Sequence, residues 1–393
     1  MKNFSNKKAI VSFFSVFVLL FLNQACSKKG DGQKLEAGQI IPVLFNPDKF
    51  PPLDSFVAEI TVIPLETNEN SLLREHPQGI KVHKGLIYIN NQRQELYVFD
   101  KNGKFIRQIG SRGQGPGEFV EVSDFIFTQD GTIELLDLNK IESYSLEGKH
   151  IRTVKRFDFL ETDIYYPRNF CKSFSSGYFF WGGMNYTGQR PDPTNLLYRL
   201  NSDMQIEAAF FDTKFGDGGT RDRFSFYKDR VLFSCSPVDY NIYQIEPNDS
   251  ISIRYTFDFG NYGIKIGKND DRTTVPADVR DDYVRDISHF HETDLFLVFG
   301  FNYKSRTYIL LYSKATGQIF IKPYHPSANG KEMRLYSIHA IYNDLLVAFV
   351  QVSWLKMDLE RMSPENIKKW GLEKYKKLDD EDNPVLILYK TKF

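Results

Sequence analysis

A glycine-rich segment, GSRGQGPGEF at positions 110–119, carries polar side chains that could meet a ligand. It lacks the Gly-Lys-Ser/Thr ending and the following helix that a phosphate-binding loop needs. Its glycines suit a crossing between two strands, where positive φ angles are required. We predict that Arg112, Gln114 and Glu118 point at a ligand from this crossing, or that Arg112 and Glu118 simply pair with each other.

A second candidate is the sequence WGGMNY at positions 181–186. Exposed aromatic rings can stack on the faces of sugars, and an amide can bind their hydroxyl groups. Trp181, Asn185 and Tyr186 are therefore candidate carbohydrate-binding residues. The alternative, which we favour for Trp181, is that this side chain ends a buried strand.

Acidic and histidine residues gather between positions 278 and 292. His289 and His291 alternate with a phenylalanine, so on a strand they would share one face, as metal ligands can. Metal binding would also need several donors to converge within about 2.0–2.6 Å of one ion. We instead expect a solvated, irregular insertion and predict no metal site. The residues of this cluster are Asp278, Asp281, Asp282, Asp286, His289, His291 and Glu292.

Sequence motifs for catalysis are absent from the chain. It has no Gly-x-Ser-x-Gly elbow for a nucleophilic serine and no His-Glu-x-x-His helix for zinc. The carboxylates at positions 379–382 lie in a charged run that we expect to be exposed. We predict no catalytic residue and no cofactor, so an enzyme is the less favoured class.

The first residues resemble an export signal. Three lysines precede an apolar stretch at positions 9–22, which is too short to span a bilayer of ~30 Å. The following LNQAC at positions 22–26 resembles a bacterial lipoprotein processing box, with Cys26 as the acylated residue; the alternative is ordinary secretion without acylation. We assign residues 1–25 to the signal peptide, and residues 26–55 to the lipidated cysteine and a polar tether.

The remaining cysteines, Cys171 and Cys235, lie in apolar, strand-like runs. An oxidising compartment would permit a disulfide between them. We favour two buried free thiols in neighbouring repeats, because a disulfide needs Cα atoms within roughly 7 Å of each other.

Composition excludes one class of partner and favours one class of fold. Lys and Arg total 50, as do Asp and Glu, so the charge pattern expected of a nucleic-acid binder is missing. Aromatic residues make up 15% of the chain, which favours β-structure with a packed core.

Short strands with period-2 alternation repeat from residue 56 to the C-terminus. In the clearest repeat, positions 79–110, turn residues separate four such strands, as in one blade of a propeller. Blades take ~40–50 residues, so residues 56–393 fit about six of them. The predicted fold is all-β: a six-bladed β-propeller with four-stranded antiparallel blades, small helical insertions and an N-terminal signal peptide.

Two further features complete this prediction. The strand at 56–66 is expected to be the outermost strand of the blade that residues 385–390 complete, which would close the ring. A helix is predicted over residues 363–377, with Ser363 as its N-cap and Pro364 in its first turn. A weaker helical pattern covers residues 277–287.

Specific motifs also resemble a known family. VFDKNGKFIRQIGSRGQGPGEF at 98–119, followed by DFIF at 124–127, resembles an NHL-type propeller repeat. Together with IPLET at 63–67 and DNPVLILYK at 382–390, these motifs resemble the six-bladed β-propeller lipoproteins of Gram-negative gut anaerobes. The resemblance implies a lipid-anchored propeller in the cell envelope, facing the periplasm or the cell surface, and no particular activity.

The sequence therefore predicts a binding or sensing module for a glycan, a peptide or a partner protein of the envelope. Its expected partners are the membrane, through Cys26, and that ligand, but not nucleic acid. The alternative is a calcium-dependent hydrolase or lyase with an axial site, in which calcium would be the cofactor. That alternative requires acidic and amide side chains from several blades to converge on the axis.

Overall fold

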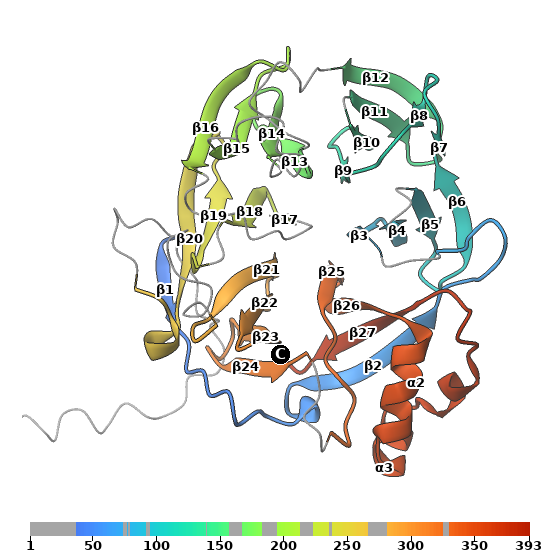
Figure 1. Ribbon diagram of the computed structural model, residues 1–393, viewed down its shortest axis with the longest axis vertical. Coiled ribbons are helices and arrows are strands. Elements are labelled where there is room, and N and C mark those ends of the chain that lie inside the picture. The colour runs from blue at the N-terminus through green and yellow to red at the C-terminus, as the bar shows by residue number, and fades with distance from the viewer. Residues whose placement is uncertain are drawn as a thin grey trace, which may run out of the picture.

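Six sheets are arranged radially around one axis in the computed structural model (Figure 1). The structure describes residues 37–73, 77, 79–91, 95–138, 140–156, 167–182, 195–212, 223–235, 238–265, 281–324 and 330–393. Within each blade, the four main strands pair in antiparallel fashion and follow one another in order outward from the axis. This confirms the predicted all-β, six-bladed propeller.

The first three blades follow one another along the chain, each beginning at the axis. Blade 1 contains β3 (Gly79–His83), β4 (Leu86–Asn90), β5 (Leu96–Phe99) and β6 (Phe105–Ile109). Blade 2 contains β9 (Asp124–Phe127), β10 (Thr132–Asp137), β11 (Lys140–Ser145) and β12 (His150–Arg156). Blade 3 contains β13 (Asn169–Lys172), β14 (Tyr178–Trp181), β15 (Asn195–Leu200) and β16 (Ile206–Asp212).

The last three blades recruit the N-terminal residues as well. Blade 4 contains β17 (Phe224–Tyr227), β18 (Arg230–Ser234), β19 (Asn241–Ile245), β20 (Ile251–Asp258) and the added outer strand β1 (Gln39–Pro42). Blade 5 contains β21 (Arg285–Glu292), β22 (Phe296–Tyr303), β23 (Arg306–Ser313) and β24 (Ile319–Pro323). Blade 6 contains β25 (Ile338–Tyr342), β26 (Leu345–Val350), β27 (Val385–Thr391) and the outer strand β2 (Val57–Pro64).

The two ends of the propeller meet in blade 6. β2 pairs with the C-terminal β27 in antiparallel register, with Val62 opposite Ile387. The N-terminal strand thereby covers the edge that β27 would otherwise expose, as predicted. This closure stabilises the ring. Along the chain, β2 is followed by the first strand of blade 1, so blades 6 and 1 cannot separate until β2 detaches from β27.

Each blade face is buried against its neighbour, so the core is divided into six hydrophobic clusters, one for each pair of adjacent blades. Tyr88 of blade 1 and Phe125 of blade 2 belong to one such cluster. Cys171 and Cys235 share the cluster between blades 3 and 4, where both are buried free thiols, as favoured from the sequence. Burial raises the pKa of the Cys171 thiol.

The turn between the third and fourth strands is the same in five blades. One turn residue adopts a positive φ: 85° at Gly103, 88° at Gly148, 62° at Met204, 62° at Asp249 and 70° at Gly317. Its backbone N–H donates to the carbonyl group that begins the turn. Glycine adopts this conformation most readily, and it occupies the position in three of these five blades.

In the described residues, α-helices occur only near the C-terminus, at the lower right of Figure 1. α3 (Pro364–Lys369) begins after Ser363, whose hydroxyl accepts from the N–H of Asn366, as predicted. The single helix predicted over residues 363–377 is divided, since Gly371 adopts a positive φ of 64° and the chain continues as the 3₁₀ helix η6 (Glu373–Lys377). α2 (Val352–Arg361) was not expected. No helix of the described part is long and apolar enough to cross a membrane. Two shorter 3₁₀ turns are η1 (Leu53–Ser55) and η4 (Gly260–Tyr262).

The weak helical prediction over 277–287 is wrong where it can be checked, since β21 begins at Arg285. Positions 277–280 lie outside the described residues. β21 is irregular: Asp286 and His289 have positive φ angles, and its register with β22 shifts twice. These bulges remove the period-2 alternation by which the sequence would have indicated a strand.

Residues 39–55, expected to belong to a polar tether, pack along the outside of blades 4 to 6. β1 pairs in parallel with β20, so Gln39 lies opposite Tyr255. Phe45 and Leu53 are then buried. The described fold thus includes residues 39–55. It begins before residue 56, where we predicted the propeller domain to start.

Candidate functional site

The inner strands of five blades enclose a cavity of about 630 Å³ on the axis, here called the channel cavity. β3, β9, β17, β21 and β25 form its wall, whereas β13 does not. The cavity lies where the inner strands turn into the second strands, because turn residues such as Lys228 and Asn343 line it. Small-molecule sites typically have volumes of ~300–1,000 Å³.

Flat apolar rings occupy part of this wall. The ring of Phe226, on β17, is 54% exposed although it lines the cavity. On the β3 and β9 side, the imidazole of His83 stacks on Phe127 with ring centroids 4.2 Å apart. Such rings can pack against a planar or ring-shaped ligand.

Most charged groups of the wall are already paired within the protein. The Asp294 carboxylate accepts from the Tyr227 hydroxyl at 2.5 Å and lies 2.6 Å from Lys228 Nζ. Glu292 lies 2.7 Å from Lys314 Nζ, and its side chain is 1% exposed. Each of these charges therefore has an opposite charge beside it.

On the other side of the cavity, Lys81 Nζ lies 2.7 Å from Asp124. The second carboxylate oxygen of Asp124 accepts from the backbone N–H of Phe170, on β13, at 3.2 Å. This pair links the inner strands of blades 1, 2 and 3. It holds the wall in place and leaves little net charge for a ligand to meet.

Imidazoles are concentrated around the axis. His83 and His291 line the cavity, as does His339 of β25, whose ring centroid is 5.3 Å from that of His289. Burial lowers the pKa of His291 to about 3 and that of His289 to about 4. Repulsion from Arg223 contributes at His289, and repulsion from His289 contributes at His291. These imidazoles are neutral at pH 7 and can both donate and accept hydrogen bonds.

The acidic and histidine cluster is therefore not a solvated insertion, since His289, His291 and Glu292 lie on the inner strand β21. Asp281 and Asp286 both pair with Arg285. Across the described residues, no group of three or more His, Cys, Asp or Glu could hold a metal ion. Asp282 is exposed, and Asp278 lies outside the described part.

The glycine-rich segment 110–119 lies at the outer side of the ring, beside β6 and β12 (Figure 1). Its short strands β7 (Ser111–Arg112) and β8 (Glu118–Phe119) pair in parallel. The Glu118 carboxylate accepts from the N–H of Gly115 at 2.8 Å. No ion pair joins Arg112 and Glu118 in the part of the chain described here.

Packing explains why this segment lies at the periphery. The Tyr144 hydroxyl of β11 donates to the carbonyl group of Gly117 at 2.7 Å, and a Cβ on Gly117 would collide with His150 of β12. Arg112 and Gln114 are exposed on this outer segment and do not line the channel cavity.

Trp181 is 1% exposed at the end of β14, as the packing alternative predicted. The guanidinium of Arg223 lies over its ring, 4.3 Å from the centroid. Its proposed companions Asn185 and Tyr186, and Cys26, lie outside the described residues. The structure therefore places one candidate of this loop in the core and leaves the others as predictions.

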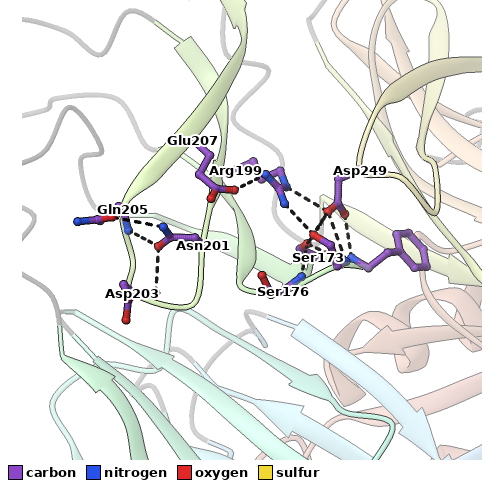
Figure 2. A network of polar contacts seen from close by, with 10 residues as sticks. Ser173, Ser176, Arg199, Asn201, Asp203, Gln205, Glu207 and Asp249 are labelled. Carbon is purple, nitrogen blue, oxygen red and sulfur yellow. Dashed lines mark hydrogen bonds and ion pairs between the residues drawn. The ribbon is translucent and has the colours of Figure 1, made fainter.

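A polar network joins blades 3 and 4 at the turn that follows β13 (Figure 2). The Asp249 carboxylate accepts hydrogen bonds from the Ser173 hydroxyl at 2.7 Å and from the N–H of Phe174 at 2.8 Å. It also accepts from Ser175, and from Arg199 Nε at 3.1 Å. Burial alone would raise the pKa of Asp249, but these hydrogen bonds, with those from Ser175 foremost, lower it.

Sequence reasoning missed His83 and Phe226 and did not place His291 at the axis. Each lies near the end of the first strand of its blade, immediately before the turn to the second strand. That repeated position was the available signal, because inner strands run along the axis and bring these ends to one face.

Comparisons with known proteins agree with this architecture. Residues 41–390 match a family model described as "Domain of unknown function (DUF4934)". No curated protein matches the chain. The crystal structure of a protein described as exported, from Bacteroides fragilis NCTC 9343, is 20% identical, with a TM-score of 0.69 over 90% of this chain and 100% of that one.

Other solved structures are more distant. The extracellular domain of a hybrid two-component system from B. thetaiotaomicron is 9% identical, with a TM-score of 0.39 over 70% of this chain and 32% of that one. A protein of unknown function from Bacteroides caccae is 11% identical, with a TM-score of 0.40 over 63% and 81% of the two chains. The B. fragilis structure shares the fold with this chain.

Proposed function

The chain belongs to the family described as Domain of unknown function (DUF4934), and we propose that its propeller is a binding or sensing module of the cell envelope. The observation that carries the proposal is the channel cavity, where five blades bring open aromatic faces and neutral imidazoles together. A rigid ring of blades holds these groups in place before a ligand arrives, which reduces the entropic cost of binding.

The charges of the cavity wall favour binding over catalysis. Hydrolysis of a glycosidic bond uses two carboxyl groups on either side of the scissile bond. Here Asp294 and Glu292 are each engaged by lysine side chains at 2.6 and 2.7 Å. Hydrogen bonds from Lys228 and Tyr227 lower the pKa of Asp294, which makes this carboxylate a weaker base.

An envelope location is part of the proposal. The apolar stretch and the LNQAC box would export the chain and attach lipid to Cys26. The similar B. fragilis structure is itself described as an exported protein. The cavity would then meet ligands outside the cytoplasm, either a glycan, a peptide or another envelope protein.

Thermal-shift measurements with panels of glycans and peptides test this proposal. A ligand at 100 times its Kd should stabilise the protein by ~2.7 kcal/mol. The variant Phe226→Ala should weaken binding about tenfold, because it removes an exposed stacking surface. Ile151→Ala is the matched control, since Ile151 is 49% exposed on the outer strand β12.

Two results would contradict the proposal. One is a ligand whose affinity is the same for Phe226→Ala, Ile151→Ala and the wild type, because its site would lie outside the cavity. The other is turnover of a glycan that a chelator abolishes, together with bound calcium in elemental analysis. That second result would favour the hydrolase or lyase alternative.

A further inference from the structure

The chemistry of the channel cavity restricts the class of ligand, and this inference rests on the function proposed above. Among the residues that the structure describes, the cavity wall includes five charged side chains, and four of them have partners of opposite charge. The fifth, Asp344, is exposed in the turn after β25, where water can solvate it. An ionic ligand would therefore lose its hydration without gaining an unpaired counter-charge. The paired residues are Lys81, Lys228, Glu292 and Asp294.

Hydrogen-bonding capacity nevertheless remains in the wall. His83 Nε2 and His291 Nε2 are buried and have no hydrogen-bond partner in the described part of the chain. Burial lowers the pKa of both imidazoles, with repulsion from Lys84 adding at His83 and from His289 at His291. A neutral imidazole has one donor nitrogen and one acceptor nitrogen. A hydroxyl group can both donate and accept, so it can pair with either nitrogen. Buried polar atoms without partners are uncommon and favour a bound group or water that satisfies them.

The two imidazoles approach the cavity from different sides, His83 on β3 in blade 1 and His291 on β21 in blade 5, with blade 6 between these blades in the ring. Between them along the chain, Phe127 and Phe226 add apolar ring faces from blades 2 and 4. A ligand in this cavity thus meets polar atoms and flat apolar surfaces from different directions. Saccharide rings combine these properties, since their edges carry hydroxyl groups and their faces carry C–H groups.

We infer that the channel cavity takes an uncharged, hydroxyl-rich ring compound, of which a neutral saccharide is the prime example. His83 and His291 bind its hydroxyl groups, and Phe226 packs against its face. Uronic acids, sulfated sugars and other anions are disfavoured because both lysines of the described wall are already paired. Amino sugars and peptides with charged side chains are disfavoured because the one unpaired carboxylate, Asp344, is exposed to water and offers only a weak, screened attraction.

A glycan array that presents each backbone in neutral, uronic-acid, sulfated and amino forms tests the inference with the mature protein, residues 26–393. Neutral glycans should bind, and each charged form should bind at least tenfold more weakly. Raising NaCl from 50 to 500 mM should change the affinity for the neutral glycan less than twofold, because salt screens only ionic attraction.

Three variants locate the site. Phe226→Ala and His291→Gln should each weaken neutral-glycan binding about tenfold. Asp344→Asn is the control at the rim and should change the affinity less than twofold. If His291→Gln fails to fold, His83→Gln provides the same information, because His83 lies on a regular strand near the turn.

The outcomes separate this inference from the proposed function. If acidic or amino sugars or peptides bind best, and Phe226→Ala weakens that binding, the cavity is a binding site but the ligand class inferred here is wrong. If no saccharide binds, the inference also fails. If a neutral glycan binds all three variants as tightly as the wild type, both the inference and the proposed function fail.

Discussion

Asp249 occupies a turn position that glycine fills in three other blades. At φ 62° the backbone is in the left-handed region, which aspartate tolerates better than most residues. The side chain offsets any cost of this conformation, because its carboxylate accepts from Ser173, Ser175, Phe174 and Arg199 in the neighbouring blade. A single residue thereby joins the turn of one blade to the turn of the next.

Replacing Asp249 by glycine separates these two effects. Glycine adopts the same φ freely, so Asp249→Gly removes only the carboxylate. We expect a loss of about 1–3 kcal/mol in the free energy of unfolding, because the partly exposed donors of this turn and Arg199 lose an acceptor whose own side chain is buried. Urea unfolding measures this value. Asp249→Asn keeps an acceptor and should cost less than Asp249→Gly, and an equal cost would contradict the role assigned to the network.

The histidines at the axis predict a pH dependence of stability. The folded-state pKa values of His289, about 4, and His291, about 3, lie below the 6.5 of a free imidazole. Below pH 6.5 the unfolded chain binds protons that the folded protein does not, so stability is full above pH 6.5 and falls as the pH decreases. Arg223 lies beside His289, and repulsion from its guanidinium adds to this effect.

Between pH 7 and pH 4.5 we expect a loss on the order of 2–4 kcal/mol in the free energy of unfolding. The double variant His289→Gln, His291→Gln should show a shallower slope over this range. Both proteins should be insensitive to pH between 7.5 and 8.5. Urea unfolding at several pH values provides the measurement, and identical slopes would show that these imidazoles titrate normally in the folded protein.

The N-terminal segment 39–55 forms little regular secondary structure, but it makes one specific contact with the blades. Phe45 inserts among four aromatic rings, with centroid distances of 5.1–5.3 Å, all at steep angles. β1 alone has four residues and could not hold the segment by its hydrogen bonds. The aromatic contact is therefore expected to carry most of the docking energy. The four rings are those of Tyr262, Phe301, Tyr303 and Tyr308.

Adjacent residues allow a matched test of this docking. Phe45→Ala should reduce the free energy of unfolding by about 3–5 kcal/mol, because it leaves a cavity among the four rings. Leu44 is 95% exposed, so Leu44→Ala should change it by less than about 0.5 kcal/mol. Calorimetry of both variants tests the expectation. Similar values for the two would mean that this segment does not pack on the blades in solution.

At the scale of the whole molecule, five blades of one closed ring together form the channel cavity, and no single blade could form it alone. Blade 6 is completed by β2 from the N-terminal part and β27 from the C-terminal part. The segment that precedes β2 leads back along the outside of blades 5 and 4 (Figure 1). The predicted tether to Cys26 would therefore leave the propeller at its outer wall, away from the channel cavity.

The proposed anchor predicts a change of location in the cell. Cys26→Ala should move the protein from the membrane fraction to the soluble envelope fraction, because acyl chains contribute about 0.8 kcal/mol per buried CH₂ group to membrane binding. Fractionation with labelling by a fatty-acid analogue measures this shift. Circular dichroism should be unchanged. Wild-type protein that is soluble and unlabelled would contradict lipidation.

The sequence alone determined the blades. The strands at 124–127 and 132–137 were evident from local alternation, and their turns from glycine, because both signals depend on neighbouring residues. The closing pair β2 and β27 also followed, since two strands at the chain ends had no other partner. Local patterns failed at β21, whose bulges hide its alternation, and at α2.

Only the tertiary structure decided where a ligand could bind. The segment containing Arg112, Gln114 and Glu118 was one candidate from the sequence, but contacts with β11 and β12 hold it at the outer side of the ring. His83, Phe226 and His291 carry no shared motif. They meet because ring closure brings the ends of separate inner strands to one axis. That convergence depends on how whole blades pack, which short-range patterns in a sequence do not encode.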